Sequence, residues 1–326
     1  MKLTAILSAT LVLFSVAGCH FNVSFGGRNF DFQGKTATTM QQDQIAASIK
    51  TLTVESEFCE VTVVGSDEPA AWSFDGKVWA KQQQDADDLV SSLRVMTDQV
   101  DDDLTLRVKL PEDEQSKLRG VEGILKIAIP ASTTVAIRNA HGDAIVEGTG
   151  QSTTVVNRHG NIRFASIDGE ASFDCEHGET IGSGLTGSAE FRARHGEIEL
   201  KDASATLSFD ARHSDVKLAS LDSSLQLTGR HGQAVISGVI TSIEGDIQHY
   251  DLMASLSNDD FAAVSVKSQH GDVQLKLPES ATPSILASAE FGEVKSEFDP
   301  AGGGESAIKV NVQHGDVKIL KATFAE

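Results

Sequence analysis

The sequence predicts an all-β protein, and more specifically a single-chain β-solenoid with coils of about 18 residues. Seven histidines follow one another at intervals of 18 residues, and two more continue the series at longer intervals. These nine of the chain's ten histidines are His141, His159, His177, His195, His213, His231, His249, His270 and His314. Between them apolar residues alternate with polar ones, which is the pattern of a half-buried strand. A fixed repeat length combined with this alternation is typical of coils stacked on one another.

The repeated turn places glycine after histidine and usually an acidic residue or asparagine after glycine, as in His195-Gly196-Glu197. Glycine suits a tight turn with positive φ because it has no Cβ that would clash. Ser214 and Tyr250 occupy the glycine position in two coils, so the turn does not require glycine absolutely. One alternating strand follows the turn, and a second leads to the next histidine after a bend. Each coil is therefore expected to run strand, bend, strand, tight turn.

Stacked coils would align equivalent side chains in columns. Phe173, Phe191 and Phe209 fall in one inward column. Four small residues fill a neighbouring column: Cys175, Ala193, Ala211 and Gly229. Strand parity also places the histidines on the inward side, at the edge of the core, and Phe291 in a histidine position agrees with partial burial. Burial of the apolar core, at roughly 25 cal/mol per Å², is the main stabilising contribution.

Charged residues fall on the outward side. Arginines precede the turn at Arg158, Arg194, Arg212 and Arg230. Acidic residues follow it at Asp143, Glu179, Glu197 and Asp215. Ion pairs across the turn are expected, each worth ~0–1 kcal/mol when exposed. The net charge of −20 argues against nucleic acid as a partner, because phosphate binding needs clustered Lys and Arg. The same charge opposes electrostatic attachment to anionic lipid headgroups.

Residues 1–18 are expected to be a signal peptide, which is removed from the mature protein. Lys2 supplies the positive start, and Leu3–Ala17 is an apolar stretch too short for a comfortable membrane span. Val16-Ala17-Gly18-Cys19 resembles the lipobox of bacterial lipoproteins, which implies cleavage before Cys19 and acylation of that cysteine. The alternative is an ordinary secretory signal with a chance cysteine. His20, in place of an aspartate after the cysteine, resembles sorting to the outer membrane in a Gram-negative cell.

The rest of the chain divides into three parts. Residues 19–47 carry the acylated Cys19 and are expected to form a tether, because they show little apolar periodicity. Residues 48–140 are expected to form irregular N-terminal coils, with one short amphipathic helix within Gln82–Met96. Residues 141–326 hold the regular His-Gly-Asp repeats. Although 326 residues suffice for two ordinary domains, a solenoid can use this length in one body.

Two further cysteines lie in the expected coils. Cys175 belongs to the column of small residues and is expected to be a buried, inert thiol. Cys59 maps to the turn position of an earlier coil. Because the two are well separated in the predicted stack, a disulfide between them is not expected.

Three groups of residues carry a resemblance to a known family: Glu60-Val61-Thr62-Val63, Ile127-Ala128-Ile129-Pro130, and the turns from Gly142-Asp143 to Gly315-Asp316. Over residues 48–320 the chain resembles the DUF4097 family of candidate adhesins. Its members show a Gly-acidic-Val turn, an Ile-x-Ile-Pro strand and serial Ser/Thr-x-Gly-Asp-Val coils. The resemblance implies a β-solenoid and an adhesin-like role, with no catalytic residues to transfer. This chain departs from the family pattern because histidine precedes the glycine almost throughout.

Three interpretations of the nine histidines compete. The first is a structural ladder, in which rings about 4.8 Å apart stack along the sheet. The second is binding of Zn, Cu or Ni, because imidazole is the common ligand for these ions and neighbouring coils could share one ion. Against it, no second histidine or cysteine lies within the same coil. The third is a response to pH, because protonated imidazoles in a column would repel one another.

Enzymatic activity is not expected, because the carboxylates are spread evenly and no nucleophile elbow, P-loop or dinucleotide motif is present. The chain is instead predicted to be a non-enzymatic, lipid-anchored envelope protein without a cofactor, serving as a scaffold or surface-interaction module. Expected partners are the membrane, through the lipid anchor, and an envelope protein or polysaccharide. The alternative function is metal binding or a pH response through the histidines.

Overall fold

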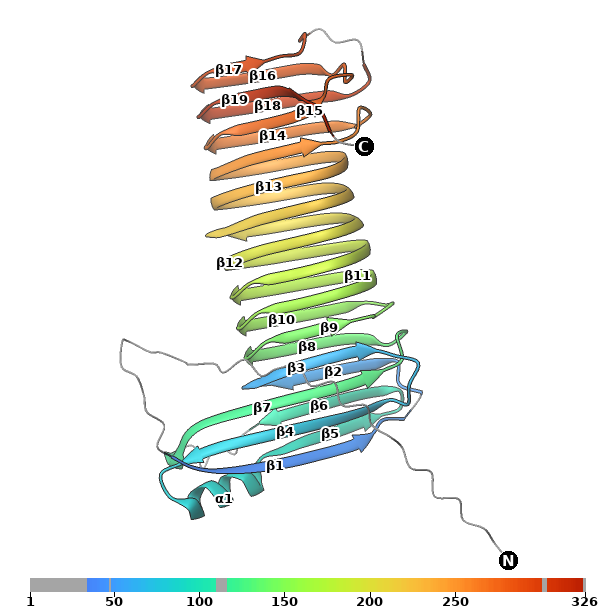
Figure 1. Cartoon of the computed structure of the whole chain (residues 1–326), viewed down its shortest axis with the longest axis vertical. Helices are drawn as coiled ribbons and strands as arrows, with labels where there is room; N and C mark the ends of the chain where they lie inside the picture. The colour runs from blue at the N-terminus through green and yellow to red at the C-terminus, as the bar shows by residue number, and fades with distance from the viewer. Residues whose placement is uncertain (1–33, 47, 110–115, 301–303, 325–326) are drawn as a thin grey trace, which may run out of the picture. The chain divides into compact units, whose positions relative to one another are not determined.

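A computed structural model describes residues 34–46, 48–109, 116–300 and 304–324. The expected signal peptide and Cys19 lie outside this range. The described residues form one helix and 19 strands that belong to a single sheet, so the all-β prediction is confirmed (Figure 1). The elements are β1 (Lys35–Gln44), β2 (Thr51–Ser56), β3 (Cys59–Gly65), β4 (Ala71–Ala80), α1 (Gln83–Ser92), β5 (Arg94–Val100), β6 (Asp103–Lys109), β7 (Leu118–Ile129), β8 (Thr134–His141), β9 (Ala144–Glu147), β10 (Thr153–His159), β11 (Ile162–His177), β12 (Thr180–Arg212), β13 (Ser214–Leu256), β14 (Ala263–His270), β15 (Val273–Pro278), β16 (Ser284–Phe291), β17 (Val294–Ser296), β18 (Ala307–His314) and β19 (Val317–Ala322).

The central part of the sheet is parallel and in register with itself. From β10 to β13 each residue pairs with the residue 18 positions further along, for example Phe173 with Phe191 and Leu207 with Leu225. The strands β11, β12 and β13 continue through their bends, so the chain winds from one layer directly into the next (Figure 1). Side chains at equivalent positions therefore lie one strand spacing apart, about 4.8 Å.

The N-terminal part contains antiparallel pairs that the repeat pattern did not predict. The strands β2 and β3 pair in parallel with β8 and β9 on one side, and with β6 and β7 on the other. Antiparallel pairs join β4 to β7, β1 to β4, and β5 to β6. The predicted helix is found as α1, where Ala86 and Leu89 are buried. This excursion between β3 and β8 gives the first layers a different construction from the regular coils.

Part of the expected tether is wrong, because residues 35–44 form the strand β1. Ten residue pairs join β1 to β4, from Lys35 with Ala80 to Gln44 with Ala71. Most β1 side chains are exposed, so the segment lacks the apolar alternation that marks a strand in the sequence. Its backbone hydrogen bonds instead complete the outer edge of β4, which would otherwise be open.

The last layers do not follow chain order. The strand β18 pairs with β14 on one side and with β16 on the other, and β19 lies in the same way between β15 and β17. Val310, for example, pairs with both Val266 and Ala287. The chain thus skips one layer at β16 and returns to fill it with its final strands. As a result Phe291 lies beyond His314 at the end of the stack, although it precedes His314 in the sequence.

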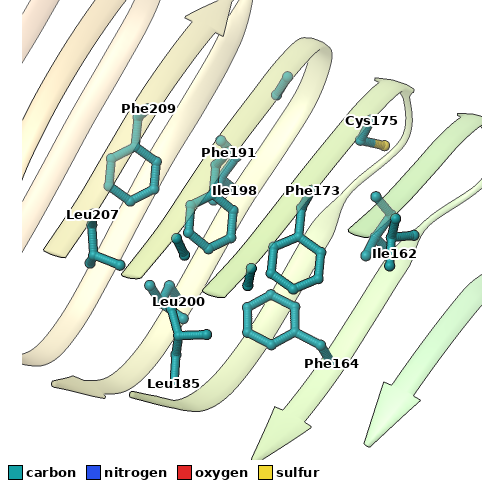
Figure 2. Packing of buried hydrophobic residues seen from close by; sticks show 14 of the residues in the cluster. Ile162, Phe164, Phe173, Cys175, Leu185, Phe191, Ile198, Leu200, Leu207 and Phe209 are labelled. Carbon is teal, nitrogen blue, oxygen red and sulfur yellow. The ribbon is translucent and has the colours of Figure 1, made fainter. Parts of the chain in front are cut away.

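The core is a set of stacked apolar columns, as the spacing predicted. The rings of Phe173, Phe191 and Phe209 are buried, with centroids 5.3 and 5.0 Å apart (Figure 2). The small column is also found, by pairing of equivalent residues: Cys175, Ala193, Ala211 and Gly229. Beside Gly229 the space is filled by the Tyr250 ring, whose hydroxyl donates a hydrogen bond of 3.1 Å to a buried carbonyl oxygen. The apolar columns hold adjacent layers in register.

Replacing Phe191 by alanine tests the contribution of this column. The ring is 1% exposed, and a cavity between two other rings should lower the free energy of unfolding by about 3–5 kcal/mol. Chemical denaturation of the full chain measures the change. The control is Phe291→Ala, where the ring is 61% exposed and the expected loss is below about 1 kcal/mol. Equal losses for the two variants would contradict the assignment of the core.

Candidate functional site: the histidine column and the polar groove

The turn at each histidine has a backbone conformation with positive φ. In six coils the glycine after the histidine takes it: Gly142, Gly160, Gly178, Gly196, Gly271 and Gly315. In three coils the histidine itself takes it, with φ values of 52°, 58° and 53° at His213, His231 and His249. This shift by one residue explains how Ser214 and Tyr250 are tolerated in the glycine position. Close stacking adds to the requirement, because a Cβ on Gly196 would lie only 1.8 Å from the carbonyl oxygen of Gly178.

All nine imidazoles form one continuous stack, which we call the histidine column. Centroids of neighbouring rings are 4.4–5.4 Å apart and their planes differ by 4–16°. Phe291 ends the stack, with its ring 4.8 Å from that of His314. The spacing equals that of neighbouring strands, so the column follows directly from the register of the sheet.

The histidines do not lie on the inward side, so that prediction was wrong. Eight of the nine side chains are exposed and only His270 is half-buried. In the coil of His195, Ala193 is buried, Arg194 is exposed and His195 is exposed as well. The positive-φ turn breaks the alternation of the strand at this point, so parity no longer predicts the direction of the side chain. Phe291, which suggested partial burial, is 61% exposed.

The stacked geometry does not favour the metal interpretation. An imidazole nitrogen binds a metal along a direction in its ring plane, at about 2.0–2.1 Å for zinc. Nearly parallel rings about 5 Å apart direct these lone pairs side by side and not toward a shared ion. Among the residues that the structure describes, no group of three or more His, Cys, Asp or Glu side chains is arranged to hold a metal ion.

Two members of the column show a shifted protonation equilibrium. Burial lowers the pKa of His141, and the neighbouring His159 lowers it further. Burial likewise lowers the pKa of His270, together with repulsion from His249 and His314 on either side. His270 Nδ1 is shielded from solvent and has no hydrogen-bond partner within the described chain. Both shifts favour the neutral imidazole, which is the form that stacks without charge repulsion.

A second column, two residues after the histidines, has a structural role that the sequence did not reveal. Asp143 Oδ1 accepts a hydrogen bond of 2.9 Å from the backbone N–H of Asn161 in the next layer. The Asn161 side chain accepts in the same way from the N–H of Glu179, also at 2.9 Å. The same contact recurs at Asp215, Asp251, Asp272 and Asp316. These side chains tie one turn to the next.

The ion pairs expected across the turn are not those that form in the described part of the chain. Arg194 pairs with Glu176 at 3.2 Å, and Arg212 pairs with Asp210 at 2.9 Å. Asp143 is an ion-pair partner of Arg163, which follows the turn. Arginines before the turn thus pair with acids on their own strand face, because the turn directs the two sets of side chains to different faces.

Next to the histidine column lies a polar groove of about 450 Å³. It runs over the strands that lead into the histidines, across the later layers of β13 and across β14, β18 and β16. Its first wall is the position directly before the histidine: Arg230, Gln248, Gln269, Gln313 and Glu290. Its second wall lies two residues earlier: Thr228, Asp246, Lys267 and Asn311. Sequence reasoning missed this groove because outward polar residues carry no distinctive signal.

The groove differs from the rest of this face in how its charges are satisfied. In the earlier layers, Arg192 pairs with Glu190 at 2.6 Å, and Arg194 and Arg212 also have acidic partners. By contrast, none of the four charged groove residues has an ion-pair partner within the described chain: Arg230, Asp246, Lys267 and Glu290. Polar groups that are free to bind another molecule therefore gather where the face is hollowed.

Both described cysteines are free and buried, as expected. Burial raises the pKa of Cys59 to about 12 and that of Cys175 to about 11. At neutral pH both stay as thiols, which are poor nucleophiles. In the described residues, no helix has the length and apolar character that a membrane span requires.

The fold and site thus define an all-β repeat protein with a stacked aromatic column and a polar groove. No family model matches the chain, and no curated protein matches it. It is similar to the solved structure of a candidate cell adhesion protein from Clostridium sporogenes, at 13% identity and a TM-score of 0.21, over 88% of this chain and 100% of that one. A candidate adhesin from Bacteroides fragilis gives 10% identity and a TM-score of 0.38, over 88% and 97%. A candidate lipid-binding protein from Parabacteroides distasonis gives 13% and 0.31, over 89% and 98%. Similarities at this level do not show a shared function.

The lowered pKa values predict a loss of stability in acid. The unfolded chain, with histidine pKa values near 6.5, binds protons before folded His141 and His270 do. Stability present above that pH is therefore lost as the pH falls through 6.5 and then through the folded values. We expect the variant with His141→Gln and His270→Gln to lose less in Tm than the wild type between about pH 7.5 and about pH 5.

The control for this experiment is Gln269→Asn, which changes an amide beside His270 that does not titrate. It should keep the pH dependence of the wild type. If the double histidine variant loses as much Tm in acid as the wild type does, the effect assigned to these two imidazoles is wrong.

Proposed function

We propose that the chain is a β-solenoid of the cell envelope, of the kind that the DUF4097 resemblance implies, which binds a partner on its outer polar face and catalyses no reaction. The observation that carries this proposal is the polar groove, where charged and amide side chains without intramolecular partners converge on a rigid sheet. Polar groups placed on a paired sheet bind with little loss of conformational freedom, which favours affinity.

The solenoid description is supported by the pairing of each residue with the residue 18 positions further along from β10 to β13. Each layer contacts mainly its two neighbours, so outward side chains repeat along the face. Such a surface can offer the same weak contact several times to an extended partner, and several weak contacts add up to useful affinity.

A binding role without catalysis is supported by the uniformity of the column. Catalytic sites single out individual groups and shift their pKa values toward the operating pH. In this chain the imidazoles repeat along one stack, and the two described thiols are buried with raised pKa values. The carboxylates after the turn accept backbone hydrogen bonds, which is a structural task.

Location in the envelope is supported by the lipobox-like segment that ends at Cys19. A single acyl chain holds a protein at a membrane only weakly, and the several chains of a lipoprotein anchor hold it firmly. We propose a lipid-anchored protein, at the outer membrane if the cell is Gram-negative.

The anchor is tested by Cys19→Ala in the full chain. We expect the protein to move from the membrane fraction to the soluble fraction, and the mature protein to lose the mass of its acyl chains. Cys175→Ala is the matched control, because alanine already occupies the equivalent position in the next two coils at Ala193 and Ala211. Membrane retention of the Cys19→Ala variant would contradict acylation at that residue.

The binding role is tested by sedimentation of the released full chain with washed envelope fragments of the producing bacterium. We expect saturable binding that is weakened by combined Arg230→Ala and Lys267→Ala changes in the polar groove. The matched control is Arg192→Ala with Arg212→Ala, which removes two paired arginines from the earlier layers of the same face. Absence of saturable binding to any envelope fraction would contradict the proposed function.

A further inference from the structure

We propose that the polar groove binds an uncharged polysaccharide chain, held mainly by the amides of Gln248, Gln269 and Gln313. This inference rests on the proposed function and adds the chemical class of the partner. Three properties of the groove support it: the balance of its charges, the regular spacing of its amides, and the pairing of the strands beneath it.

The charges of the groove balance locally. Two cationic residues, Arg230 and Lys267, face two anionic residues, Asp246 and Glu290, whereas the whole chain has a net charge of −20. An anionic polymer would meet the surrounding negative field, and a cationic one would find a better surface elsewhere on the chain. A neutral, strongly polar ligand matches a region in which opposite charges cancel.

The amides are spaced by the sheet. Gln248, Gln269 and Gln313 occupy equivalent positions in three successive layers, so they recur about every 4.8 Å. A primary amide donates through its nitrogen and accepts through its oxygen, as a sugar hydroxyl also does both. A column of amides can therefore hydrogen-bond successive sugar rings of one extended chain.

The amide column is only partly occupied within the protein. Gln248 Nε2 donates to Gln269 Oε1, and Ser288 Oγ donates to Asn311 Oδ1 at 3.4 Å. The Gln313 amide has no hydrogen-bond partner in the described part of the chain. Donors and acceptors thus remain for a ligand along the whole wall, and most of all at Gln313.

A polypeptide fits the groove less well. A peptide that adds to a sheet needs an edge strand with unpaired backbone groups. The strands beneath the groove are paired on both sides, since β14 lies between β13 and β18, and β18 lies between β14 and β16. Peptides that bind without backbone pairing need apolar pockets, and the walls of this groove are polar.

The test uses native gel electrophoresis of the full chain through gels that contain one purified polysaccharide. The neutral set is dextran, amylose and a mixed-linkage β-glucan, and the acidic set is alginate and hyaluronan. We expect at least one neutral polysaccharide to retard the wild type. Gln269→Ala combined with Gln313→Ala should weaken that binding about tenfold or more, because two hydrogen-bonding amides are lost.

Gln226→Ala is the matched control, since Gln226 is an exposed glutamine of β13 on the same face but outside the groove. It should be retarded like the wild type. Thermal unfolding of all variants checks that these surface changes leave the fold intact. Retardation of the double variant equal to that of the wild type would overturn the assignment of the groove.

Two further outcomes separate this inference from the proposed function. If no neutral polysaccharide retards the wild type, or if only acidic ones do, the inferred ligand class is wrong. The proposed function then stands as long as the groove variants still lose sedimentation with envelope fragments. If envelope binding is also absent, both proposals fail.

Discussion

Every side chain in the regular part of this protein must tolerate a near copy of its environment about 4.8 Å above and below it. That constraint follows from parallel pairing at a fixed offset of 18 residues. Apolar residues satisfy it easily, which is why phenylalanines stack through the core. Like charges satisfy it poorly, so the acidic column after the turn is stabilised by backbone N–H groups of the adjacent layer. The same closeness leaves no room for a Cβ at Gly178 and Gly196.

The histidine column is one solution to this constraint on an exposed turn. A neutral imidazole is flat and can stack on its copy at the strand spacing, and it can also adopt positive φ, as His213 and His231 do. Protonation would place like charges about 5 Å apart, where even solvent screening leaves a repulsive interaction. Stacking and the neutral form therefore support each other, and the lowered pKa of His270 between two other rings is the expected consequence.

Much of the architecture could be predicted because it repeats. The offset of 18 residues, the Phe191 column and the helix α1 each follow from a local pattern that the sequence displays several times or strongly. The strand β1 could not be predicted, because its contribution is backbone pairing by mostly exposed residues. The direction of the histidines depends on a positive-φ residue that breaks strand parity. The late insertion of β18 depends on pairing between distant segments, which no local pattern records.

The polar groove lies where the repeat itself becomes irregular. Along the earlier layers, equivalent residues are 18 apart, but Gln248 and Gln269 are 21 apart, and Glu293 and Asp316 are 23 apart. Natural sequences depart from a consistent local pattern mainly where function requires it. In the regular layers the arginines and acids pair with one another, whereas in the irregular layers the charged groups stay unpaired within the described chain. If coil duplication alone had shaped this face, the ion pairs of the earlier layers would recur in the later ones. Their replacement by amides and unpaired charges points to a surface adapted for contact with another molecule.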